Sequence, residues 1–121
     1  MIGYATIGSN DLEKSKTFYD KVLAPLGGKR GFANDRMQGY VKSGSAMLAV
    51  CKPYNGEKAS PGNGNMVALP APTPEIVNEV HALALANGGI DEGKPGARSP
   101  SFYGAYFRDL DGNKVCVFKA G

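Results

Sequence analysis

Histidine and cysteine, the side chains that most often hold metal ions or form disulfides, are scarce in this sequence. It contains one histidine, His81, and two cysteines, Cys51 and Cys116. Two cysteines form neither a disulfide framework nor a CxxC metal motif. One imidazole makes no metal site by itself, so we interpret His81 as a residue on the flank of a helix.

Long apolar runs and dense basic clusters are also absent. No apolar stretch reaches the ~18 residues of a membrane span, and the opening residues, MIGYATIG, lack the pattern of a signal peptide. The net charge is +3 and no basic run is longer than Lys29-Arg30, whereas nucleic-acid binding needs a clustered basic patch. We therefore expect a cytoplasmic protein whose partners include neither nucleic acid nor a membrane. The mild positive charge favours neutral or anionic small ligands.

Turn residues are abundant, with 17 glycines and 8 prolines in a chain of 121 residues, a length that fits one domain. Residues 3–9, GYATIGS, have the β-branched and aromatic character of a strand. A helix is predicted to follow, with Asn10 as its N-cap and Glu13 completing a capping box. Its apolar stripe has helical spacing: Leu12, Phe18, Tyr19, Val22 and Leu23. Short strands are predicted next, at 29–33, 37–42 and 46–52.

The same order returns after residues 53–65, a stretch rich in Pro, Gly and Asn that we interpret as a linker. Residues 65–71 predict a strand, and Thr73 is the predicted N-cap of a second helix with Pro74 at its first position. Three more strands are predicted at 89–92, 103–108 and 114–119, with residues 93–101 as a loop. The chain therefore predicts one α+β domain made of two βαβββ modules, residues 1–53 and 64–121.

Three stretches in this order carry a resemblance to a known superfamily: TIGSNDLEKSKTFYDKVLAPLG (6–27), PGNGNMVALPAPT (61–73) and FYGAYFRDLDGNKVCVF (102–118). They are similar to the glyoxalase / bleomycin-resistance / extradiol dioxygenase superfamily, also called vicinal oxygen chelate. The resemblance implies paired βαβββ modules whose two curved sheets surround a cavity. It also implies a homodimer, in which the modules pair either within one chain or between chains.

Metal-dependent members of this superfamily place His, Gln or Glu ligands on the first and last strands of each module. The positions that match carry Tyr4, Met66 and Cys116 here, with the fourth position near Ala49. None of these suits Mg, Mn, Ni or Fe, and the Tyr, Met and Cys set suits copper on softness alone. We therefore expect a member that keeps the cavity and binds no metal ion and no cofactor.

Strand alternation predicts which side chains face the cavity. If Asp109 pairs with Asn113 around the turn, Tyr106 lies opposite Cys116 and Gly104 opposite Phe118. The predicted lining is apolar and aromatic, which is typical of a site for a small organic molecule: Tyr4, Thr6, Met66, Ala68, Phe102, Tyr106, Cys116 and Phe118. Arg108 and Lys114 lie near the turn, either as contacts for an anionic group or as solvated charges.

Three functions stay open at this point. The first is metal-free binding of a small organic ligand. The second is a glyoxalase-like lyase or isomerase, related to lactoylglutathione lyases, in which Tyr4, Tyr106 or Cys116 acts as a catalytic residue. The third is a dimeric scaffold with no active cavity.

Overall fold

The computed structural model describes residues 1–121, which form two modules of one α-helix and four strands each. The first module contains β1 (Tyr4–Gly8), α1 (Leu12–Leu23), the short 3-10 helix η1 (Ala24–Leu26), β2 (Lys29–Ala33), β3 (Met37–Val41) and β4 (Met47–Cys51). The second contains β5 (Val67–Pro70), α2 (Pro74–Ala86), β6 (Ile90–Ser99), β7 (Phe102–Arg108) and β8 (Lys114–Ala120). The predicted α+β fold with paired βαβββ modules is confirmed.

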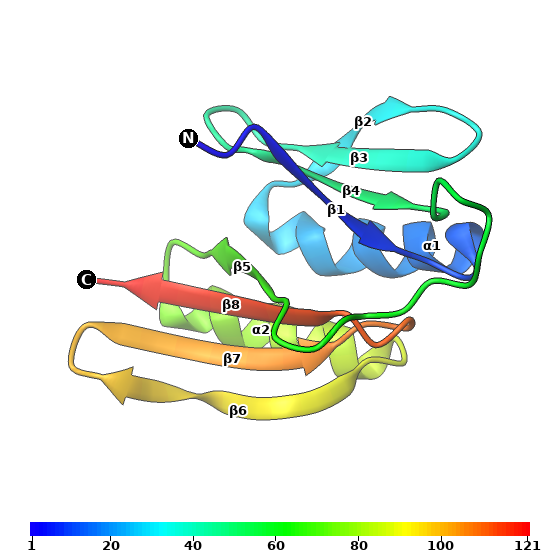
Figure 1. The fold of residues 1–121 in the computed structure, drawn as a ribbon. Helices are drawn as coiled ribbons and strands as arrows, with labels where there is room; N and C mark the ends of the chain where they lie inside the picture. Colours follow the sequence, from blue (N-terminus) through cyan, green and yellow to red (C-terminus); the bar gives the residue numbers. More distant parts are fainter.

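Each module builds its own mixed sheet. The strand orders are β1-β4-β3-β2 and β5-β8-β7-β6, and in each sheet the first strand of the module runs parallel to the last. The two sheets lie side by side, with both helices on the same side of the molecule (Figure 1). We call the face of each sheet that points away from the helices the open face.

The helices form because their apolar residues recur at helical spacing and bury one stripe against the sheets. Phe18, Tyr19 and Val22 of α1, together with Val77 and Val80 of α2, are almost completely buried. They belong to one cluster of 17 buried residues that receives side chains from both modules. Neither helix has the length and apolar character needed to cross a membrane.

The N-cap of α1 differs from the sequence prediction. Asp11, not Asn10, caps the helix, because an Oδ1 of Asp11 accepts the Lys14 amide at 3.2 Å. The Asn10 side chain is occupied elsewhere: it accepts the amide of Ala59 and donates to the carbonyl of the same residue. Asn10 therefore fastens the segment between the modules, and the predicted capping box with Glu13 is wrong. Thr73 caps α2 as predicted, accepting the amide of Ile76 at 3.2 Å.

The predicted loop at residues 93–101 is wrong for residues 93–99, because β6 continues to Ser99, and only Pro100 and Ser101 form the turn that follows. The sequence reads as a loop because Gly93, Pro95 and Gly96 are poor strand residues. They are tolerated because β6 is the edge strand of its sheet, and its pairing with β7 shifts register between Asp91 and Gly93 and again between Gly93 and Gly96. Edge positions and bulges are where proline occurs in sheets.

The turn between β7 and β8 holds the two modules together. It closes as predicted, with the Asp109 amide donating to the Asn113 carbonyl at 2.9 Å and Gly112 at a φ of 84°. The buried Asp109 carboxylate accepts the Tyr19 hydroxyl of α1 at 2.6 Å and the Asn113 side-chain amide at 2.9 Å. Asn113 also donates to the carbonyl of Gly8 at the end of β1.

This network predicts that Tyr19→Phe destabilises the protein by about 1–3 kcal/mol, because a buried carboxylate oxygen loses a donor. Tyr103→Phe is the matched control, since the Tyr103 hydroxyl bonds Asn78 at an exposed position. It is expected to cost less than about 0.5 kcal/mol. Urea unfolding of both variants measures the difference, and equal losses would contradict the role given to Tyr19.

The unfolding free energy of Tyr19→Phe should also depend on pH differently from that of the wild type. Burial, followed by the Asp109 carboxylate, holds the pKa of Tyr19 well above its ordinary value. Above about pH 10 the unfolded chain loses this proton while the folded chain keeps it, so the unfolding free energy falls as pH rises. The unfolding free energy of Tyr19→Phe should fall less steeply than that of the wild type over this range, by about 1.4 kcal/mol per pH unit. Urea unfolding at several pH values measures both slopes, and equal slopes would contradict a Tyr19 that keeps its proton in the folded protein.

Candidate functional site

The open face of the second sheet carries a row of aromatic and apolar side chains from β7 and β8. Tyr106 pairs with Cys116 and Gly104 with Phe118, as the turn predicts. The Phe102 ring stacks on Phe118 with centroids 5.2 Å apart and planes 8° from parallel. A Cβ at position 104 would lie 2.8 Å from Phe102, so the glycine leaves the space into which this ring folds.

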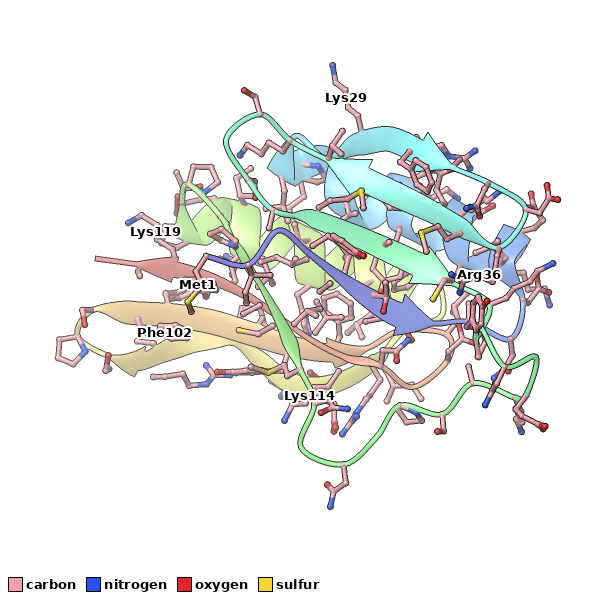
Figure 2. All side chains as sticks on the ribbon, turned by 45° about the horizontal axis from the view of Figure 1, so that its top comes forward. Met1, Lys29, Arg36, Phe102, Lys114 and Lys119 are labelled. Atoms are coloured by element: carbon pink, nitrogen blue, oxygen red, sulfur yellow. The ribbon has the colours of Figure 1, made fainter.

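Two cations lie against Tyr106 on this face. The guanidinium carbon of Arg98 is 5.4 Å from the ring centroid and the Lys114 Nζ is 5.6 Å from it. Figure 2 shows Lys114 and Phe102 near opposite ends of this sheet. The sequence prediction did not include Arg98, because this residue falls in the stretch that was predicted to be a loop. The available signal was the order of Gly93, Gly96 and Arg98, because glycines leave a flat strand surface on which a long side chain can lie.

Arg108, the other predicted anion contact, has a different environment. Its Nε donates to Glu92 at 2.6 Å and its Nη1 to the carbonyl of Gly112 at 3.1 Å. The charge of Arg108 is therefore compensated by a carboxylate on the neighbouring strand. Lys114 forms no ion pair with any acidic side chain.

Cys116 is 1% exposed although it belongs to the open face. Burial raises the pKa of its thiol, while the Tyr106 hydroxyl, Arg98 and Lys114 act in the opposite direction and lower it less. The net direction is upward, so the thiol keeps its proton at neutral pH. Tyr106 has its own pKa raised, first by desolvation and then by Cys116. This pair is therefore neutral at pH 7.

The open face of the first sheet is also apolar. Thr6 pairs with Ala49 and Tyr4 with Met47 across β1 and β4. The side chain of Met47 lies over Gly39 of β3. Met47 was not among the predicted lining residues, although alternation from Ala49 places it on the same face.

One open pocket of about 380 Å³ joins the two modules on this side, with Thr6, Met66 and Lys114 in its wall. Tyr4 does not reach it and is 62% exposed, and Met66 is 47% exposed. Ala68 pairs directly with Cys116 on β8. One chain therefore brings Thr6, Met66 and Lys114 together, and separately gathers Ala68, Phe102, Tyr106, Cys116 and Phe118 on one sheet.

Other depressions lie away from the open face. One, of about 820 Å³, is shallow and lined mainly by polar residues around Asn10, Lys58 and Asp111. A second, of about 330 Å³, lies between the end of α1 and the β3–β4 hairpin, with Leu26, Leu48 and Leu69 in its wall. Neither contains any of the predicted site residues.

The residues at the superfamily's ligand positions do not fit a divalent metal ion. No group of three or more His, Cys, Asp or Glu side chains lies close enough to hold one. Tyr4 and Met66 are largely exposed and Cys116 carries a protonated thiol, whereas the thiolate is the ligand form of cysteine. The single imidazole, His81, is buried in α2 and its Nε2 contacts Asp91 at 3.0 Å.

The sequence matches a family model over residues 1–117, and the model describes the Glyoxalase/Bleomycin resistance protein/Dioxygenase superfamily. The chain belongs to this superfamily. The resemblance seen in the sequence is confirmed at that level, and the paired modules are its fold.

Solved structures agree with this assignment. A glyoxalase/bleomycin resistance protein from Albidiferax ferrireducens T118 is 38% identical with a TM-score of 0.92, and the match covers 100% of this chain and 99% of that chain. Hypothetical protein SA1046 from S. aureus is 25% identical with a TM-score of 0.75, over 99% and 93% of the two chains. A lactoylglutathione lyase from Agrobacterium tumefaciens, at 23% identity and a TM-score of 0.70 over 98% and 92%, shares the fold. No curated protein matches the chain.

Because Cys116 is buried, we predict that its thiol reacts slowly with reagents in solution. In a Cys51→Ser variant, which leaves Cys116 as the only cysteine, the reaction with Ellman's reagent should be at least ~100-fold slower in the native protein than in urea at the same pH. The unfolded protein is the control for reagent activity. A native Cys116 that reacts as fast as the unfolded chain would contradict the environment described here.

Proposed function

We propose that this chain binds a small organic molecule on its open face, by burial and aromatic stacking, without a metal ion or other cofactor. The observation that carries the proposal is the row of Phe102, Phe118, Cys116 and Tyr106. Phe102 and Phe118 are only partly buried and form a stacked pair, so a flat ligand gains apolar contact area on it. Apolar and aromatic side chains with a few polar groups are the composition typical of small-molecule sites.

A second copy of the chain completes the site in this proposal. Tyr4, Met66 and Val41 are large apolar residues of the open side and are between 41% and 62% exposed. Apolar side chains gathered on one face are typical of interaction surfaces, and a closed two-fold pair is the commonest assembly. The proposal also keeps the cytoplasmic location, which two free cysteines favour.

A glyoxalase-like lyase or isomerase is the second candidate. It is favoured by the direct pairing of Tyr106 with Cys116 across β7 and β8, which places two of the sequence-predicted catalytic residues side by side. It is disfavoured by the raised pKa of Cys116, because a nucleophilic cysteine needs a lowered pKa or an adjacent base. Ligand binding alone requires neither a lowered cysteine pKa nor an adjacent base. A dimeric scaffold without a ligand is the outcome if the aromatic row binds nothing.

The first test uses a neutral flat probe, 2-naphthamide, whose binding is followed by NMR chemical-shift titration. Phe118→Ala should weaken its binding roughly tenfold, because the ring that the probe contacts is removed. Tyr54→Ala is the matched control, since Tyr54 is a 90% exposed aromatic residue of the linker. Unchanged affinity in Phe118→Ala would contradict the proposed binding surface.

The metal-free part of the proposal has its own measurement. Protein purified without chelator should contain less than about 0.1 equivalents of any transition metal by elemental mass spectrometry, because the donor set suits none of the divalent ions of this superfamily. A parallel preparation with added Ni, Zn or Mn followed by dialysis should give the same content. Stoichiometric retention of any of the three would overturn metal-free binding.

A further inference from the structure

Two of the positive charges on the open face have no acidic partner. Arg98 and Lys114 contact the same tyrosine ring from different strands, and neither forms an ion pair. The strands β1, β5, β7 and β8 contain no acidic residue. On β6, Glu92 is paired with Arg108 and Asp91 with His81. The face therefore carries two uncompensated cations beside an apolar surface.

We propose that the ligand is an organic anion, whose charged group lies between Arg98 and Lys114 and whose flat apolar body extends over Cys116 to the Phe102–Phe118 stack. This inference rests on the proposed function and specifies the class of ligand. It goes beyond the sequence prediction, which did not include Arg98.

The position of Arg98 is built into β6. Its side chain turns back along its own strand, and its two terminal nitrogens donate to the carbonyls of Gly96 and Lys94 at 2.8 and 2.7 Å. A Cβ at Gly93 would lie 3.2 Å from Nη2, and a Cβ at Gly96 would lie 3.3 Å from Nη1. The two glycines thus leave the strand surface free for the guanidinium. Two of its five N–H groups are used, and three remain for an anion.

Contact with an aromatic ring orients a cation without neutralising it. The Tyr106 ring attracts both charges through its quadrupole, whereas a carboxylate partner would cancel them. The guanidinium plane matches a carboxylate with two parallel hydrogen bonds, and the lysine adds a second point charge. The arrangement is therefore suited to a planar monoanion such as a carboxylate.

The spacing along β8 sets the size of the ligand. Lys114, Cys116 and Phe118 are every second residue of β8 and all lie on the open face, so neighbouring members are about 7 Å apart. An anionic group near Lys114 and Tyr106 is then about 7–13 Å from the aromatic stack. A bicyclic aromatic carboxylate spans this distance, whereas an inorganic anion reaches only the cations.

The experiment compares 2-naphthoate with its neutral amide, 2-naphthamide, by NMR titration on the full chain. Wild type should bind the carboxylate at least ~10-fold more tightly, since hydrogen bonds to charged groups are the stronger ones. Arg98→Met and Lys114→Met should each lower this preference several-fold and keep the affinity for the amide. The preference should also fall between low and high salt.

Matched controls distinguish the loss of a cation at the site from a general loss of positive charge. Lys119→Met removes a cation from the same strand on the opposite face. Arg36→Met removes an arginine that also lies over a tyrosine ring, Tyr54, and also donates to a backbone carbonyl. Both should retain the wild-type preference for naphthoate.

Each outcome has one meaning. Equal affinity of wild type for the two probes overturns the anion inference and leaves the proposed apolar binding in place. If Arg98→Met loses affinity for both probes equally, Arg98 only supports the bulged edge of β6. This result also overturns the anion inference. If neither probe binds wild type, the proposed function fails, and the anion inference fails with it.

Discussion

The buried carboxylate of Asp109 is the constraint on which the arrangement of this molecule depends. A carboxylate taken out of water is costly unless its oxygens are hydrogen-bonded, and Asp109, 3% exposed, is contacted by four donors. Two are the backbone amides of Asp111 and Asn113, and two are the side chains of Tyr19 and Asn113. The first pair shapes the turn, and Tyr19 ties the turn to a helix of the other module.

The site on the second sheet follows from this arrangement. The turn fixes the register of β7 against β8, and the register places Tyr106 opposite Cys116 and Gly104 opposite Phe118. A shift of one residue would move every one of these side chains to the helix face. Asp111 extends the connection, because it accepts the Ser15 hydroxyl and the Asn10 amide from the first module. The same short turn therefore organises both the proposed binding surface and the contact between modules.

Most of the fold was predictable because it depends on local signals. The apolar stripe of Phe18, Tyr19 and Val22 has helical spacing, Thr73 and Pro74 mark the start of α2, and Asp109 to Asn113 form a turn of standard chemistry. The misassigned N-cap has a long-range cause: Asn10 contacts Ala59, which lies 49 positions away, and no local pattern contains that contact. The misassigned loop at 93–101 has the same kind of cause, since its pairing with β7 outweighs the weak strand propensity of Gly93, Pro95 and Gly96.

The candidate site was predictable only in part for related reasons. Alternation around one known turn gave Tyr106, Cys116 and Phe118, because strand periodicity needs no tertiary information. The turn of the Arg98 side chain back along its own strand depends on the bulge of β6, and the contact between Arg108 and Glu92 depends on the register of that strand. Neither appears in a one-dimensional pattern.

The bulged edge of β6 has a consequence for how copies of this chain meet. Exposed edge strands are templates onto which another chain adds a strand, and proline and bulges suppress this. Pro95 has no amide hydrogen to donate, and the side chain of Arg98 already occupies the carbonyls of Lys94 and Gly96. The middle of β6 therefore offers an incoming strand few of the hydrogen bonds it needs. The residues that shape the proposed surface for a small molecule also keep the second sheet from growing into a longer one.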